Sequence, residues 1–211
     1  DLARSLARAD RFHAARAAAE VMAALEDPAW GPALRCEGAQ LQAELLVPGR
    51  ADLAEHGLRR ALALAEQTGD TWRVAWLRCK LAAVATAEGR VEAALRLGEQ
   101  ATRALETLQR PVVLGSAWST LCAAQLFAGD HEAARQSAAE AFTRLHAAGR
   151  SPALFAHLAL IEAGSGHVDA ARRLLAQAEP DASGPIQWVN RAIAARLRHL
   201  AHEAIGPDGV G

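Results

Sequence analysis

A short stretch that recurs five times constrains the fold of this chain more than any other feature. The five copies start at Asp10, Gly49, Gly89, Gly129 and Gly166, and these positions are 39, 40, 40 and 37 residues apart. In the clearest copy, Gly129 is followed by Asp-His-Glu-Ala-Ala-Arg. A fixed period of this length is typical of proteins built from stacked helix pairs. The sequence therefore predicts an all-α repeat architecture.

Each copy predicts a helix, a tight turn and a second helix. Glycine adopts a left-handed conformation at low cost, so it can end the first helix. Acidic residues then stabilise the N-terminus of the second helix, and they are Asp52, Glu92, Glu132 and Asp169. Two small residues, seven positions apart, allow close helix approach: Ala54 and Ala61, Ala94 and Ala101, Ala134 and Ala141, Ala171 and Ala178. The first copy departs from this pattern, because Ala15 is followed at that spacing by Met22. Eight residues before each turn lies a leucine that we expect to anchor the first helix: Leu2, Leu41, Leu81, Leu121 and Leu158.

This pattern predicts one domain over residues 1–205, with repeat units at about 1–27, 28–70, 71–110, 111–150 and 151–180. The expected helix pairs are 2–9 with 12–25, 33–46 with 51–67, 71–88 with 91–108, 112–128 with 131–148, and 153–163 with 168–178. An amphipathic helix over 186–205 should cap the stack, because a terminal repeat needs a polar outer face. We expect residues 206–211 to form a disordered tail. The chain opens with Asp1, so we also expect it to be a piece of a longer protein.

The leucine, the Gly-Asp turn and the two alanines resemble the tetratricopeptide repeat, over about Asp1 to Ala178. Three of the spacings are 39 or 40 residues, where the family unit has about 34, and no proline follows the second helix at the usual place. The run from Ala61 to Asp70 resembles the long-helix version found in large bacterial signalling ATPases and transcription activators. The resemblance implies a right-handed superhelix, and in those proteins the repeats form a regulatory arm.

The resemblance also implies a concave groove lined by the first helix of each pair. The candidate binding residues are Ala43, Leu46, Trp72, Trp76, Cys79, Ala83, Ser119, Ala123, Leu126, Phe127 and Leu160. Trp72 is included because it lies four residues before Trp76 and shares its helix face. These positions lack the lysine, arginine and asparagine with which related domains clamp acidic peptide tails. Two alternatives stay open: an open channel for an apolar helix, a neighbouring domain or a small apolar ligand, or tight coiling that buries the same residues as core.

Composition and charge argue against several classes of partner. The net charge is −1, with 23 basic and 24 acidic side chains interspersed, so the chain has no general electrostatic footprint for nucleic acid. No uninterrupted apolar run approaches ~18 residues, and nothing resembles a signal peptide. We therefore expect a cytoplasmic protein with no membrane span. Three cysteines without a CxxC pair, Cys36, Cys79 and Cys122, are expected to be buried thiols in a reducing compartment.

The chain offers little support for catalysis. The segment His131-Glu-Ala-Ala-Arg135 begins like the zinc protease motif HExxH, but arginine replaces the second histidine ligand. His199 and His202 share a helix face with Glu203 beside them, and we expect this to be a solvated face because a metal needs a further ligand. No phosphate-binding GxxxxGK[ST] loop and no nucleophile–histidine set can be assembled. The sequence therefore predicts no enzyme, no metal and no cofactor.

These observations favour a non-catalytic protein–protein interaction or scaffold module. The resemblance implies the regulatory arm of a larger bacterial transcriptional or signalling regulator. The expected partner is another protein, a neighbouring domain of the same longer chain, or a second copy. The alternative is a small-molecule sensor that holds an apolar ligand in the Trp72/Trp76 groove.

Overall fold

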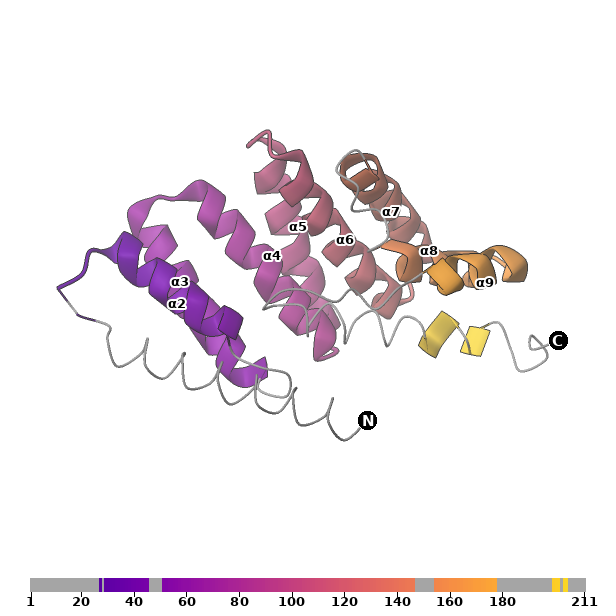
Figure 1. Ribbon diagram of the computed structural model, residues 1–211, viewed down its shortest axis with the longest axis horizontal. Coiled ribbons are helices and arrows are strands. Elements are labelled where there is room, and N and C mark those ends of the chain that lie inside the picture. Colours follow the sequence, from indigo (N-terminus) through magenta and orange to yellow (C-terminus); the bar gives the residue numbers. More distant parts are fainter. Residues whose placement is uncertain are drawn as a thin grey trace.

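The computed structural model describes residue 27 and residues 29–45, 51–146, 154–177, 199–201 and 203–204 (Figure 1). Within these ranges every regular element is a helix. The helices are α2 (Pro32–Leu45), α3 (Ala51–Thr68), α4 (Thr71–Ala87), α5 (Val91–Glu106), α6 (Pro111–Ala128), α7 (His131–His146), α8 (Phe155–Gly164) and α9 (Val168–Gln177). The expected first helix pair, the tail and all but the end of the capping helix lie outside the described residues. The all-α prediction is confirmed for the described part of the chain.

The expected helix limits agree with those of α2 to α9 to within two residues at each end. The agreement arises because the turns are encoded locally. Gly69, Gly89, Gly129 and Gly166 all have positive φ, between 66° and 81°. At Gly129, the glycine N–H bonds to the Leu126 carbonyl at 3.1 Å and the following N–H bonds to the Gln125 carbonyl at 3.0 Å. This paired arrangement satisfies the last carbonyls of a helix and reverses the chain, and it recurs at the other three glycines. Gly49 lies outside the described residues.

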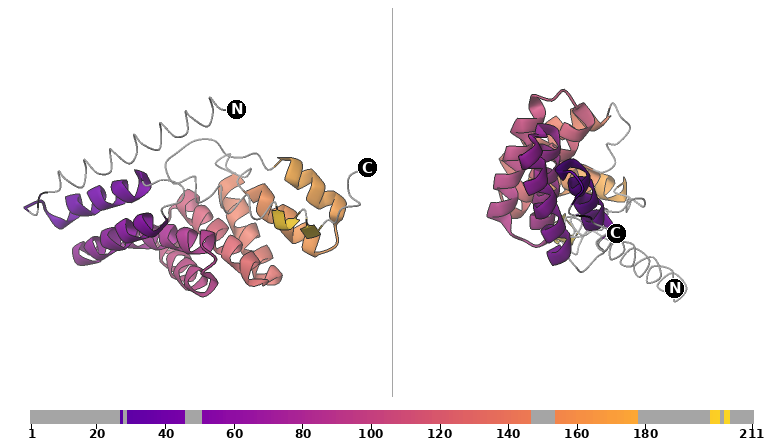
Figure 2. Two further views of the ribbon diagram at one scale, coloured as in Figure 1. Left: turned by 90° about the horizontal axis from the view of Figure 1, so that it is seen from below. Right: turned by 90° about the vertical axis from the view of Figure 1, so that its left-hand side faces the viewer.

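The helices form antiparallel pairs that stack in a row from α2 and α3 to α8 and α9 (Figures 1 and 2). Within the row, the second helix of one pair packs against the first helix of the next, as α3 does against α4 and α5 against α6. The first helices α4, α6 and α8 also contact one another in sequence order. This arrangement places the first helices on one side of the stack.

The small residues of the repeat lie where helices approach most closely. Ala94, Ala101, Ala134 and Ala141 are fully buried, as are Ala61 and Ala171. Gly98 of α5 packs so closely on Leu121 of α6 that an added Cβ would lie 3.1 Å from the leucine Cδ1. Ala178 lies outside the described residues. The close approach explains the alanine content, because larger side chains would separate the helices.

The anchor leucines follow the expectation except at α2. Leu81 and Leu121 are buried and Leu158 is half-buried, but Leu41 is 49% exposed. The expected core role of Leu41 is therefore wrong in this structure. The contact between Leu121 and Gly98 gives the physical reason: an anchor leucine packs on the second helix of the preceding pair. No described helix precedes α2, so Leu41 has no such neighbour within the described ranges.

Helix α6 lies in the middle of the stack and carries no charged residue. Its 18-residue window has a mean hydropathy of 1.3, which makes it, among the described helices, the one long and apolar enough to cross a membrane by length and composition. Packing accounts for this composition, because α6 contacts α4, α5, α7 and α8. A helix surrounded by other helices is apolar on most of its sides.

Candidate functional site

The residues predicted to line the groove fall into two groups along the first helices. Ala43, Ala83, Ala123, Leu126 and Leu160 belong to one large buried cluster, and Phe127 packs against it. Trp72, Trp76 and Cys79 belong to a second cluster between α4, α5 and α6. Ser119 is half-buried, and Leu46 lies outside the described residues. The first group lies nearer the C-terminal ends of α4 and α6, and the second nearer the N-terminal end of α4.

The small-residue group is closed to solvent. Ala83 is 4% exposed and Ala123 is 1% exposed. The same cluster contains Ala201, with Leu200 packed against it, so these two residues lie against the core formed by the first helices. At these positions the side chains contribute apolar contacts to the fold, and their use in partner binding stays a prediction.

The tryptophan group keeps part of its surface accessible. Trp72 and Trp76 lie one turn apart on α4 and are both half-buried. The Lys80 ammonium lies 4.2 Å from the Trp76 ring centroid, and the Arg110 guanidinium carbon lies 5.0 Å from the Trp72 ring centroid. Cations at these distances are attracted to the negative face of an indole ring. The Nε1 atom of Trp72 is buried and has no hydrogen-bond partner in the structure.

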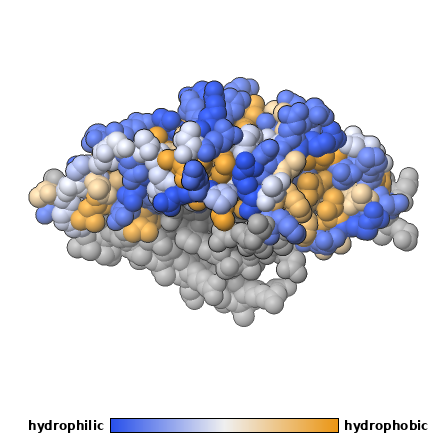
Figure 3. All heavy atoms as spheres, turned by 90° about the horizontal axis from the view of Figure 1, so that it is seen from above, coloured by the Kyte–Doolittle hydropathy of each residue, from blue (hydrophilic) through white to orange (hydrophobic). Residues whose placement is uncertain are grey.

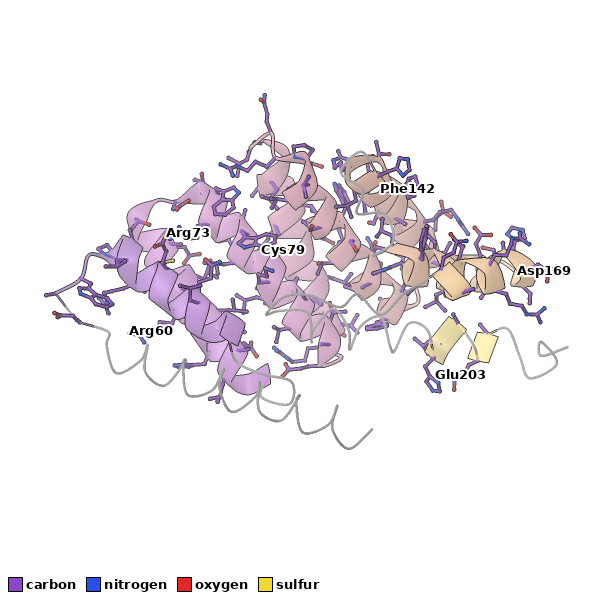
Figure 4. All side chains as sticks on the ribbon, in the orientation of Figure 1. Arg60, Arg73, Cys79, Phe142, Asp169 and Glu203 are labelled. Carbon is purple, nitrogen blue, oxygen red and sulfur yellow. The ribbon has the colours of Figure 1, made fainter. Side chains whose placement is uncertain are left out.

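The charges on α4 are all positive, because the helix contains Arg73, Arg78 and Lys80 and no acidic residue. Two of the cations are engaged by neighbouring helices: Arg73 Nη2 donates to Glu37 of α2 at 3.2 Å, and Arg78 Nη2 donates to Glu66 of α3 at 3.0 Å. Figure 4 shows Arg73 beside α2 and Cys79 further along α4, in the middle of the stack. The acid before α4, Asp70, accepts a hydrogen bond from the Arg73 backbone N–H at 3.0 Å and caps the helix.

The three thiols are buried and unbridged. Burial raises the pKa of all three, to about 12 for Cys122, while the nearby Arg73 partly offsets the effect at Cys36. The Cys36 thiol donates to the Ala61 carbonyl at 3.1 Å, and the Cys79 thiol lies 3.8 Å from the Thr120 hydroxyl. A thiol held protonated away from solvent is a poor nucleophile, so these groups serve packing.

The segment from His131 to Arg135, and His199, make packing contacts, hydrogen bonds and ion pairs with other residues of the chain. The His131 ring lies against Gly164, with its Nδ1 and Cε1 3.3 Å from the position of an added Cβ. Arg135, which replaces the second histidine of the protease motif, pairs with Glu132 at 2.7 Å and reaches the Ser165 hydroxyl at 2.7 Å. His199 Nε2 lies 3.4 Å from Glu203 Oε1, and the His202 side chain is outside the described residues. Among the described residues, no three His, Cys, Asp or Glu side chains come together as a metal site would need.

Sequence reasoning missed the two cations that cover the tryptophan rings. Lys80 lies four residues after Trp76 on α4, and this helical spacing was a usable signal. Arg110 gave no such signal, because its contact with Trp72 joins two helices that are distant in the sequence.

The described part of the chain is an all-α stack of helix pairs, in which Lys80 and Arg110 lie over the rings of two half-buried tryptophans of α4, Trp76 and Trp72. No family model, no curated protein and no solved structure matches this chain.

Proposed function

We propose that the chain is a non-catalytic protein-interaction module with the superhelical arrangement of tetratricopeptide repeats. The observation that carries this proposal is the half-buried pair Trp72 and Trp76 on the side of the stack formed by the first helices. Tryptophan is enriched among the residues that dominate binding energy at protein interfaces. Helix stacks are also used for binding, because their side-by-side helices present an extended surface.

The bacterial regulatory-arm hypothesis extends this proposal. In it, the module binds another protein or a neighbouring domain of the same longer chain in the cytoplasm, without direct contact to nucleic acid or membrane. The near-neutral net charge and the mixed distribution of 23 basic and 24 acidic side chains support a protein partner over nucleic acid. The resemblance of the run from Ala61 to Asp70 to long-helix repeats supports the assignment to a regulator.

A selection from a random peptide library tests the interaction function without naming a partner in advance. Peptides of about 16 residues, long enough for four helical turns, are selected on the immobilised chain. Binding of enriched peptides is then measured by fluorescence anisotropy. We expect peptides that bind the wild-type chain and bind Trp76→Ala more weakly, with circular dichroism showing that the variant is folded. Failure to enrich any binding peptide would contradict the interaction function.

The small-molecule alternative is tested on the same protein by thermal unfolding with a panel of apolar aromatic compounds and fatty acids. A ligand that binds the folded state raises the melting temperature. A rise with one of these compounds, lost in Trp76→Ala, together with no enriched peptide, would favour a sensor over an interaction module.

A further inference from the structure

We propose that the α8/α9 helix pair binds a small zwitterion with an apolar side chain, such as a free apolar amino acid or a dipeptide of such residues. The site is a cavity between the two helices with a volume of about 460 Å³, named here the α8/α9 cavity. It is lined by Leu158 and Glu162 of α8 and by Ala170, Arg173, Leu174 and Gln177 of α9. Neither Trp72 nor Trp76 lines it, so this inference goes beyond the proposed function and does not depend on it.

The α8/α9 cavity follows the line along which the two helices run side by side. The helices are antiparallel, and Leu158 lies eight residues before the turn glycine Gly166, while Leu174 lies eight residues after it. These two leucines are therefore level with each other. Positions 170, 173, 174 and 177 share one face of α9, because residues three and four apart are neighbours on a helix. A volume in this range holds a small organic molecule, and a single ion would leave most of it empty.

The apolar part of the cavity is formed by Leu158, Ala170 and Leu174, each of which is half-buried. Figure 3 shows hydrophobic side chains gathered toward the end of the stack that carries α7 to α9, with hydrophilic side chains around them. Covering partly accessible apolar side chains with an apolar group of a ligand removes their surface from water and is favourable. The apolar part of the cavity therefore favours a ligand with an aliphatic or aromatic group.

Two opposite charges line the cavity and do not pair with each other. Glu162 Oε2 lies 2.7 Å from His167 Nδ1, which leaves Oε1 without a hydrogen-bond partner among the described residues. The Arg173 guanidinium has neither a hydrogen bond nor an ion pair within the described ranges. The other acid and the other arginine of α9, Asp169 and Arg172, pair with each other at 3.4 Å. Glu162 and Arg173 are thus a separated negative and positive group in one cavity.

Helix α7, which packs against α8, adds no net charge near the turn. Arg135 of α7 reaches the Ser165 hydroxyl at 2.7 Å, and the same arginine pairs with Glu132 at 2.7 Å. The charge pattern that a ligand meets in the cavity is therefore set by Glu162 and Arg173.

A zwitterion matches this separation of charge. An ammonium donates to the Glu162 carboxylate, and a carboxylate accepts two parallel hydrogen bonds from the Arg173 guanidinium. Arg173 lies three residues, about 4.5 Å along the axis, beyond Ala170, which is level with Glu162, so the two charged groups of the ligand need not compete for one place. Gln177 Nε2 donates to the Arg173 carbonyl at 3.2 Å, which leaves the carboxamide oxygen as a further acceptor. A plain anion would be repelled by Glu162 and a plain cation by Arg173, so neither fits as well.

Isothermal titration calorimetry on the intact chain tests this inference with leucine, phenylalanine, leucylleucine and phenylalanylleucine. We expect at least one of them to bind with a Kd of about 1 mM or lower. Free amino acids and dipeptides carry the same groups, and the tighter binder gives the size of the ligand. Three compounds that each lack one group are the comparison: leucinamide without the carboxylate, 4-methylpentanoate without the ammonium, and glycine without the apolar side chain. Each should bind about tenfold or more weakly than leucine.

Two substitutions assign the charged groups of the ligand to the protein. Arg173→Gln should weaken leucine binding by about tenfold and abolish the preference for leucine over leucinamide. Glu162→Gln should do the same for the preference for leucine over 4-methylpentanoate. Arg96→Gln, which removes an exposed arginine on α5, is the matched control and should leave binding unchanged, as should Trp76→Ala. Circular dichroism melting of each variant establishes that it is folded.

Absence of heat from all four ligands at about ten times the expected Kd would overturn the inference. Binding that does not distinguish leucine from leucinamide and 4-methylpentanoate in the wild-type chain would also overturn it, whether or not the variants fold. Neither result affects the proposed interaction function, which is measured with peptides and Trp76→Ala.

Discussion

At the scale of single residues, the turns between helices depend on positive φ. Four described glycines provide it at low cost. Gln109, in the turn between α5 and α6, also has a positive φ, of 49°, and is the one described non-glycine residue to do so. It lies 40 residues after Gly69, which occupies the equivalent turn between α3 and α4. A side chain in this conformation costs roughly 1–2 kcal/mol, so the same turn is relaxed in one repeat and strained in the next.

Replacing Gln109 with glycine should therefore stabilise the protein. The net gain should be about 1 kcal/mol, because glycine makes the unfolded chain more flexible and this offsets part of the relieved strain.

Gly129→Val should act in the opposite direction and destabilise the protein. An added Cβ at Gly129 would have no neighbour within 4 Å, so the destabilisation there is conformational and not steric. Urea unfolding of both variants measures the two changes. Equal stability of wild type and Gly129→Val would show that the turn does not depend on left-handed glycine.

The thiols give a second prediction at this scale. Cys36, Cys79 and Cys122 are each at most 4% exposed, and burial raises the pKa of each. We expect a disulfide reagent such as Ellman's reagent to label none of them within minutes at pH 8 in the folded chain. All three should react in denaturant. Rapid labelling of the native chain would contradict the packing role of these residues.

At the scale of elements, an ion pair joins two neighbouring helix pairs. Glu55 of α3 receives two hydrogen bonds from Arg90, which precedes α5: Nη1 to Oε1 at 3.2 Å and Nη2 to Oε2 at 2.6 Å. Arg59 donates to the same carboxylate at 2.6 and 2.8 Å. Two-point contacts between arginine and a carboxylate fix geometry as well as adding energy. The Glu55–Arg90 ion pair therefore helps to fix the orientation of the α2/α3 helix pair relative to the α4/α5 helix pair.

Burial opposes ionisation of Glu55, but the hydrogen bonds from Arg59 and Arg90 outweigh it and lower the pKa of the carboxyl below 4.5. A carboxyl with a lowered pKa contributes stability above its unfolded pKa, and this contribution is lost as the pH falls through the folded value. Glu55→Gln should therefore destabilise the protein by about 1 kcal/mol at pH 7, a figure reduced for partial exposure of Arg90. The difference from wild type should shrink as the pH falls below 4.5.

Glu99→Gln is the matched control for this pair. Glu99 and Arg103 form an exposed pair within α5 at 3.5 Å, and such pairs contribute little. Chemical denaturation from pH 3.5 to 7 compares the variants. A stability difference between wild type and Glu55→Gln that does not change with pH would contradict the role given to this carboxylate.

At the scale of the whole molecule, local signals predicted more than long-range ones. The glycine turns and the alanine positions placed the described helices to within two residues, because both act within a helix pair or its nearest neighbour. The exposure of Leu41 could not be predicted, since it depends on what lies beyond α2. The division of the predicted groove into a closed small-residue part and an accessible tryptophan part could not be predicted either. It depends on how the first helices pack together and on the packing of Leu200 and Ala201 against their core.

This division is the central claim of the account: the small-residue part of the first helices is closed core, and the tryptophan part is accessible. Ala123 and Ser119 lie one turn apart on α6, the first 1% exposed and the second half-buried. Arginine at a closed position buries an unpaired charge, at a cost of several kcal/mol. At a partly open position, the long side chain can carry its charge to solvent.

The most direct test is therefore thermal unfolding of Ala123→Arg and Ala83→Arg beside Ser119→Arg, followed by circular dichroism. For a chain of this size, 1 kcal/mol corresponds to about 2–4 °C in Tm. We expect Ala123→Arg and Ala83→Arg to lower Tm by roughly 10 °C or more, and Ser119→Arg to lower it by less than half as much. If Ala123→Arg and Ala83→Arg instead melt within about 2 °C of the wild type, the small-residue part is an open groove. That result would contradict the account.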